Sequence, residues 1–271
     1  MPTTKKADLA VVDNEPKELL VLDESFDHLE TGLEDVSKED MAIPLLQILQ
    51  ALSPQVNKRD GAYVEGAEAG FIYNSVTATV YDGEEGVNVI PCAYRKAYVE
   101  WAPRDTGLGL IKEHESRSIL DMAIKDDKGK YVLDNGNYIE ETAYFYVLME
   151  DENGGISQAV IPMKSSQLTK ARKWVTTMKM QTRLNSKGQR VPAPMFMNRY
   201  RLTTIHQQND MGNWYGWGIS LQGPLSPEDQ DLVGTAMTFS KAVKSNEVKV
   251  QQEEQAGGST SGDTFDAEDI M

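Results

Sequence analysis

The chain has 271 residues, and its 27 Lys and Arg against 42 Asp and Glu give a formal net charge of −15. Hydrophobic residues make up 40% of it, enough to bury a core in one large domain or two small ones. The single cysteine, Cys92, excludes an internal disulfide and a cysteine-based zinc site, so we expect it to fill core space. No apolar run is long enough to cross a bilayer and none follows Met1–Lys6, so we expect a soluble protein without a signal peptide.

The negative charge is concentrated at the two ends. Residues 1–40 hold 12 acids and 4 bases, and residues 253–271 hold 6 acids and no base. Between them, 24 acidic and 23 basic side chains nearly cancel. The sequence therefore predicts an acidic N-terminal arm (1–40), a β-rich nucleic-acid-binding domain (41–248) and a disordered acidic C-terminal tail (249–271).

The first predicted element is a short helix over the apolar run Met41–Leu52, with Pro44 in its first turn. Strands follow, because apolar, β-branched and aromatic residues alternate with polar ones. Glycine-rich turns between neighbouring strands predict three hairpins, which pair 71–81 with 87–101, 138–150 with 156–163, and 196–207 with 214–222.

Two helices are predicted among the strands. The first spans Gln167–Leu184, and its apolar face consists of Leu168, Ala171, Trp174, Val175 and Met178. The second begins at the cap Ser226-Pro227-Glu228-Asp229 and ends near Lys244. We expect a mainly β fold with a few helices (α+β), an OB-like Greek-key antiparallel barrel with inserted helices and disordered acidic ends. A jelly roll is the alternative that this pattern leaves open.

One stretch is cleared of acidic residues. From residue 153 to residue 209, 57 positions contain no Asp or Glu but ten Lys and Arg. A carboxylate repels phosphate, whereas Lys and Arg release the counterions condensed on nucleic acid, so this window favours a polyanion ligand. A chance gap on an ordinary solvated face is the alternative.

Aromatic residues lie among these cations, a mixture typical of proteins that stack the bases of a single strand on rings and hold its phosphates with cations. Core packing is the alternative for each ring, and we expect it for Trp174 on the apolar helix face. The predicted nucleic-acid-binding residues are Tyr94, Lys96, Tyr98, Lys170, Arg172, Lys173, Lys179, Arg183, Lys187, Arg190, Arg199, Tyr200, Arg201, Trp214 and Trp217.

The C-terminal tip combines acids with apolar residues after a Gly/Ser linker. We predict that it binds partner proteins and occupies the basic groove when DNA is absent; a purely solubilising end is the alternative. The residues of this predicted partner-binding tail are Phe265, Asp266, Glu268, Asp269, Ile270 and Met271.

No pattern of catalytic, metal-ligating or cofactor-binding residues is present. The three histidines, His28, His114 and His206, are far apart, and Gly107-Leu108-Gly109 lacks the Gly-Lys-Ser/Thr of a phosphate loop. We therefore expect a protein that is not an enzyme and needs no metal or cofactor.

The β-rich body, the basic and aromatic middle and the tail DTFDAEDIM together resemble the single-stranded DNA-binding proteins of tailed bacteriophages. The segments Ala42–Val56, Tyr63–Thr77 and Tyr98–Arg104 are similar to phage early proteins of that kind. The resemblance implies an OB fold, cooperative coating of single strands and a tail that recruits replication enzymes in the host cytoplasm. The end Ile270-Met271 departs from such tails, which usually end in Phe.

The expected function is sequence-independent binding of single-stranded DNA in phage replication or recombination. Expected partners are single-stranded DNA and, through the tail, replication or recombination proteins; no membrane is involved, and a homo-oligomer is left open. Two alternatives are a structural or assembly protein of the virion, and an inhibitor that binds a host protein without binding nucleic acid. Salt-sensitive binding distinguishes the first function from both alternatives.

Overall fold

The computed structural model describes residues 42–127, 129–151, 154–209 and 212–245, together with Gly32 and Asp35. The predicted acidic tail lies outside these residues, as does nearly all of the predicted arm. The strands are β1 (Leu46–Ile48), β2 (Ile72–Asn74), β3 (Val80–Tyr81), β4 (Val87–Trp101), β5 (Leu110–His114), β6 (Ala123–Lys125), β7 (Tyr131–Leu133), β8 (Tyr138–Glu150), β9 (Ile156–Lys164), β10 (Thr182–Leu184), β11 (Arg190–Pro192), β12 (Asn198–Asn209) and β13 (Gly212–Pro224). The helices are α1 (Gln167–Met180) and α2 (Gln230–Lys244), with short 3-10 turns that include η6 (Met195–Met197) and η7 (Pro227–Asp229).

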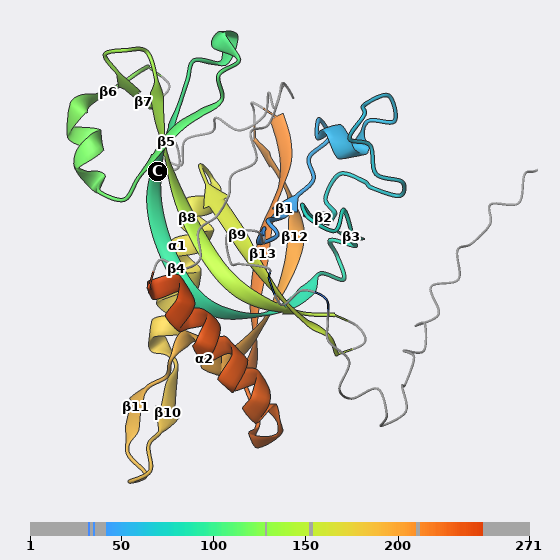
Figure 1. The fold of residues 1–271 in the computed structure, drawn as a ribbon, viewed down its shortest axis with the longest axis vertical. Coiled ribbons are helices and arrows are strands. Elements are labelled where there is room, and N and C mark those ends of the chain that lie inside the picture. The colour runs from blue at the N-terminus through green and yellow to red at the C-terminus, as the bar shows by residue number, and fades with distance from the viewer. Residues whose placement is uncertain are drawn as a thin grey trace, which may run out of the picture.

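Two long antiparallel strands, β4 and β8, form the spine of the molecule (Figure 1). They pair along almost their whole length, from Asn88 opposite Glu150 to Trp101 opposite Tyr138. At one end of the spine β12 pairs with β4 and β9 pairs with β8; at the other end β5 pairs with β4 and β7 pairs with β8. The result is a curled antiparallel sheet of eight strands, with β13 and β6 at the ends of its longest path.

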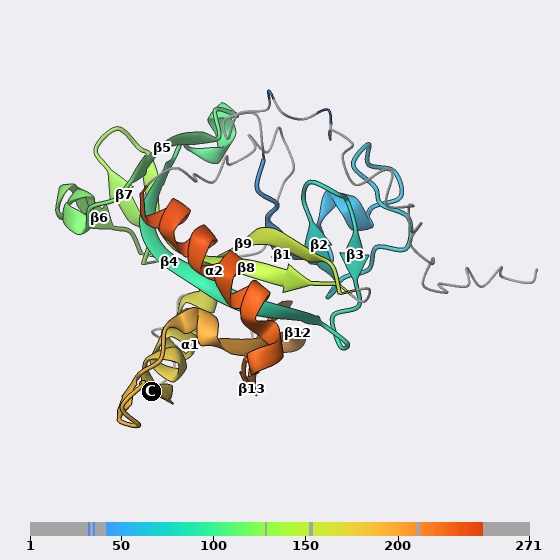
Figure 2. The same ribbon diagram turned by 60° about the horizontal axis from the view of Figure 1, so that its bottom comes forward.

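Each face of the spine is covered by one helix (Figure 2). On one face, Phe145 and Val147 of β8 pack with Trp174 of α1. On the other, Tyr146 and Leu148 pack with Phe239 of α2. Because successive side chains of a strand point to opposite faces, β8 must be apolar at consecutive positions, as its run AYFYVLM is.

The predicted mainly β fold is confirmed, and so are two of the three predicted hairpins, β8–β9 and β12–β13. The more specific expectation of an OB-like barrel stays a prediction. The second helix begins as predicted, with a capping box between Ser226 and Asp229 at η7. Neither helix of the described part is long and apolar enough to span a membrane.

The prediction for Met41–Leu52 is wrong, because this segment contains the strand β1 instead of a helix. Leu46 of β1 is fully buried, and β1 pairs with β2. The Pro44 carbonyl also accepts a hydrogen bond of 2.8 Å from the Val160 backbone N–H of β9. For a short apolar run that lies against two strands, hydrogen bonds to those strands stabilise the chain more than a local helix would.

The predicted hairpin around residues 82–86 is also wrong. The strand expected over 71–81 is divided into β2 and β3, which pair with each other, and β3 does not pair with β4. Instead the turn is fastened to β12: the Thr204 N–H donates to the Gly83 carbonyl at 2.7 Å, and Arg201 Nε donates to the Glu85 carbonyl at 2.6 Å. This contact places β4 beside β12.

Gly86 makes that close approach possible. Its φ is +73°, and an added Cβ would lie 2.0 Å from the carbonyl oxygen of Leu202. Gly107 has a similar φ of +66° but open space around it. We expect Gly107→Ala to cost about 1–2 kcal/mol from the left-handed backbone alone, and Gly86→Ala to cost clearly more because β12 must also move. Urea unfolding midpoints of the two variants measure the difference, and equal losses would contradict the packing argument.

Candidate nucleic-acid interface

Seven cations lie together on α1 and on the hairpin that follows it. The β10–β11 hairpin is a two-stranded arm that extends away from the sheet in both views (Figures 1 and 2). Its base is joined to the end of α1, where the Ala193 N–H donates to the Gln181 carbonyl at 2.9 Å. The seven residues, which we call the α1–arm cations, are Lys170, Arg172, Lys173, Lys179, Arg183, Lys187 and Arg190.

This placement corrects one prediction. The predicted helix Gln167–Leu184 includes Arg183, but α1 ends at Met180 and Arg183 lies on β10 opposite Val191. The apolar face of α1 is confirmed, with Ala171, Trp174 and Met178 buried. The cations of the helix therefore continue onto the arm instead of along one longer helix.

None of the α1–arm cations forms an ion pair with a carboxylate of the described residues. Six of the seven side chains are exposed, and Lys170 is half-exposed. Arg183 and Arg190 contact a carbonyl and a hydroxyl oxygen of their own hairpin. Helix α1 and the arm contain no acid of their own, so among the described residues this surface is positive.

Three other predicted cations are held by partners across the sheet: Lys96, Arg201 and Arg199. Lys96 Nζ lies 2.5 Å from Glu141 Oε1. Arg201 donates to the Glu85 carbonyl and, at 3.2 Å, to Asn88 Oδ1. These side chains join neighbouring strands, and the structure does not group them with the α1–arm cations.

Arg199 has the strongest set of partners. It donates to both carboxylate oxygens of Glu150 at 2.6 Å, and to Asp229 Oδ1 at 3.2 Å. The pKa of Asp229 is lowered, first by hydrogen bonds from the backbone and side chain of Ser226 and then by Arg199. Arg199 therefore links β12, β8 and the start of α2.

The predicted stacking residues are mostly core. Tyr98, Tyr200 and Trp217 are 5%, 1% and 2% exposed, so the prediction that they stack on bases is corrected. Their strands pack side chains on both faces, and alternation does not show which face is open. Trp214 is half-buried, with its indole Nε1 donating to Gln207 Oε1 at 2.9 Å. Trp174 is buried, as expected.

Tyr94 is the exception, with 39% of its surface exposed. Its ring packs on Phe145 with centroids 5.2 Å apart, and Phe145 stacks on Trp174 at 4.4 Å. The Tyr94 ring is thus the exposed end of a row of core rings. Burial raises its pKa, whereas the nearby charges of Lys96 and Arg172 lower it. The phenol is close enough to Arg172 of α1 for the charge of Arg172 to lower the pKa of Tyr94.

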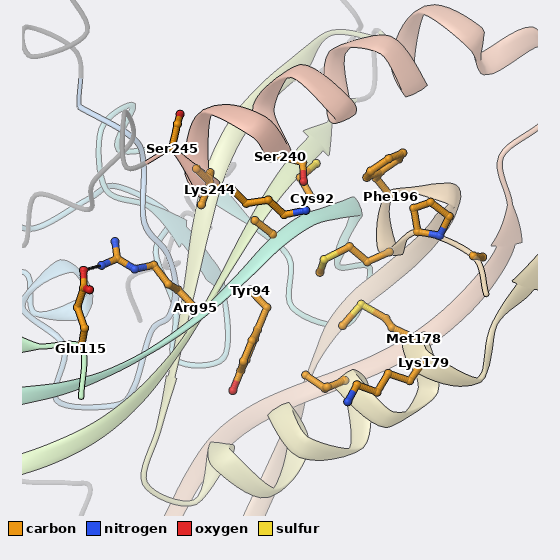
Figure 3. A pocket seen from close by; sticks show the side chains of 16 residues that line it. Cys92, Tyr94, Arg95, Glu115, Met178, Lys179, Phe196, Ser240, Lys244 and Ser245 are labelled. Carbon is orange, nitrogen blue, oxygen red and sulfur yellow. Dashed lines mark hydrogen bonds and ion pairs between the residues drawn. The ribbon is translucent and has the colours of Figure 1, made fainter. Parts of the chain in front are cut away.

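A pocket of about 850 Å³ opens beside Tyr94 (Figure 3). It lies where the outer edge of β4 has no strand partner in the described part of the chain, between Val89, which pairs with β12, and Tyr98, which pairs with β5. Its walls come from β4, the end of α1, the segment before β12 and the end of α2. Residues from these walls include Tyr94, Met178, Lys179, Met195, Phe196 and Lys244.

Sequence reasoning missed part of this pocket. Lys244 and Ser240 of α2 lie outside the acid-free window, and no local pattern connects them with Tyr94. Arg95, the residue after Tyr94 on β4, also lines the pocket and forms an ion pair with Glu115. Cys92 is buried as expected, and burial raises its pKa to about 12. The described residues contain no group of three or more His, Cys, Asp or Glu able to hold a metal ion.

Arg199, which is ion-paired, and Arg172, which is exposed, should contribute differently to the free energy of unfolding. We expect Arg199→Ala to lower the free energy of unfolding by about 1–3 kcal/mol, since Glu150 and Asp229 would be left without their charged donor. Arg172→Ala should stay within about 0.5 kcal/mol of wild type, because Arg172 is exposed and contacts no described carboxylate. Thermal unfolding of both variants checks this, and a loss of stability at Arg172 as large as at Arg199 would contradict the division.

A protein family matches most of the chain. Residues 15–249 match the model of the Pam3 phage gp34-like protein family, and this range includes the sheet, both helices and the arm. Neither the curated proteins nor the solved structures contain a match. The match supports a bacteriophage origin, as the sequence indicated. Since the family model covers most of the chain, the protein belongs to the Pam3 phage gp34-like family.

Proposed function

We propose that this protein binds single-stranded DNA without sequence preference, in phage DNA replication or recombination, and acts without catalysis. The observation that carries the proposal is the set of seven α1–arm cations, none of which pairs with a carboxylate of the described residues. Each cation that meets a phosphate releases counterions from the strand, and this release favours binding.

The shape of this surface supports the proposal. Helix α1 lies against the sheet, and the arm extends from its end, so a strand that follows the helix can also contact the arm (Figure 1). The curled sheet supplies a fixed support for the helix, as an OB-like barrel would. The protein would act in the host cytoplasm, and the tail would recruit replication or recombination proteins.

Tyr94 supplies the exposed ring on which a base of the single strand would stack. A duplex keeps its bases inside, whereas a single strand can place an unstacked base on an exposed ring. We expect a single-stranded oligonucleotide to bind more tightly than a duplex of equal length at the same salt concentration. Fluorescence anisotropy at several salt concentrations measures both affinities. Equal affinity for the two would leave only a generic basic surface, and no binding at low salt would favour a virion-assembly or host-protein-binding role.

Charge removal tests which cations meet phosphates. Replacing Arg172, Lys179 and Arg183 together with Ala should weaken binding and flatten the plot of log affinity against log salt by about 0.7 for each phosphate that no longer meets a cation. Replacing Lys58, Arg59 and Arg117 with Ala is the matched control, because it removes the same charge at exposed positions elsewhere. If both triple variants weaken binding equally, only net charge matters and the α1–arm surface is not the site.

The acidic tail would regulate DNA binding. Lys244 and Ser245, the last described residues before the tail, line the pocket beside Tyr94. Residues 263–271 contain four acids and no base, and we propose that they compete with DNA for the cations. A tether of this length keeps the tail at roughly millimolar effective concentration.

Deleting residues 263–271 should raise the affinity for single strands, most at low salt, where the attraction is least screened. It should also abolish binding of replication partners. A variant with Asp263, Asp266, Glu268 and Asp269 changed to their amides separates charge from length: it should reproduce the gain in affinity. Unchanged DNA affinity together with intact partner binding in the deletion would mean that the tail is only a solubilising end.

A further inference from the structure

The pocket beside Tyr94 is a preformed cavity with one rigid aromatic wall. Its volume of about 850 Å³ is large enough for a small ligand, and the pocket is open to solvent on one side. Tyr94 packs on Phe145, which stacks on Trp174 in the core, so the ring is held before any ligand arrives. A ring that is already fixed loses little conformational entropy when a flat group stacks on it.

The rest of the lining is apolar with a few polar groups. Met178, Met195 and Phe196 supply apolar surface, and the Ser240 hydroxyl belongs to a residue that is only 4% exposed. Lys179 from α1 and Lys244 from α2 also line the pocket, and the only carboxylate among its described lining residues, Glu115, is paired with Arg95. An aromatic ring, apolar walls and two cations form a set complementary to a nucleotide, in which the base is flat and apolar and the phosphates are negative.

The gap in the sheet adds hydrogen-bonding capacity. Between Val89 and Tyr98 the outer edge of β4 pairs with no described strand, and Ala93 and Arg95 of this stretch line the pocket. In an antiparallel strand, alternate residues direct both N–H and C=O to the same edge. Main-chain donors and acceptors on this edge can meet those of a base whatever its identity, which suits binding without sequence preference.

We propose that one base of the bound single strand turns out of the strand and enters this pocket, stacking on Tyr94, while its flanking phosphates contact Lys179 and Lys244. This inference rests on the proposed function. Lys179 belongs to both the α1–arm cations and the pocket, so a strand on α1 reaches the pocket directly. The pocket would thus fix the register of the bound DNA at one nucleotide, although binding does not depend on the base sequence.

The test is a double substitution, one on the protein and one on the DNA. Wild type, Tyr94→Ala and Tyr94→Phe are each titrated with a short single strand and with the same strand lacking one base at each position in turn. We expect Tyr94→Ala to lower the affinity about 5- to 150-fold with its salt slope unchanged, and Tyr94→Phe, which keeps the ring, to bind nearly as wild type. Lys244→Ala should lower the salt slope by about 0.7.

The decisive outcome is non-additivity. If a base lies on Tyr94, wild type should bind a strand that lacks that base more weakly, and Tyr94→Ala should show almost no further weakening. If Tyr94→Ala binds as wild type, or if its effect and the missing-base effect simply add, no base enters the pocket and the inference is overturned while the proposed function stands. If wild type binds no single strand at low salt, both fail.

Tyr94→Ala also removes the contact with Phe145, so its unfolding midpoint is measured alongside. Phe196→Ala is a second variant for the same test, since Phe196 lines the pocket but takes no part in the row of stacked core rings. It should show the same non-additivity with the same missing base. Simple addition for Phe196→Ala as well as for a folded Tyr94 variant would overturn the inference.

Discussion

The fold depends on the pairing of β4 with β8, two strands buried on both faces. A strand of this kind is stable only if each face is covered, and here α1 covers one face and α2 the other. The helices are therefore fixed relative to the sheet by the core itself. The bulge between Pro91 and Ala93 lies within the stretch of β4 whose outer edge has no described strand partner. The support and the pocket thus come from one strand.

The cations of the acid-free window divide by the kind of element that carries them. Arg199 and Arg201 lie on β12, and their partners come from segments far away in the sequence: Arg199 meets the Glu150 carboxylate, and Arg201 meets the Glu85 main-chain carbonyl. A strand exposes its side chains to those of neighbouring strands, so it acquires partners that its own sequence lacks. The exposed cations of α1 and the arm lie outside the sheet and meet no carboxylate of the described residues. An acid-free window thus indicates an acid-free surface only where its side chains do not face neighbouring strands.

The elements that the sequence predicted well are those with long, regular periodicity. The glycine-containing turns after the strand-like runs 138–150 and 196–207 identified two hairpins, and the apolar spacing from Leu168 to Met178 identified α1. The run around Leu46 was misassigned because a short apolar segment has no distinctive period. The site was predicted less well. Burial of Tyr98, Tyr200 and Trp217 depends on which face packs, and Lys244 reaches the pocket through the tertiary arrangement of α2.

The burial of Cys92 makes the chain convenient for chemical labelling. It is the only cysteine, and its thiol is held protonated in the core between the sheet and α2. Because the thiolate is the reactive form, alkylating and maleimide reagents will attack it slowly. A cysteine introduced at Ser186, in the exposed turn of the β10–β11 arm, would then be modified selectively in an otherwise natural sequence. A dye placed there would report directly on the environment of the arm.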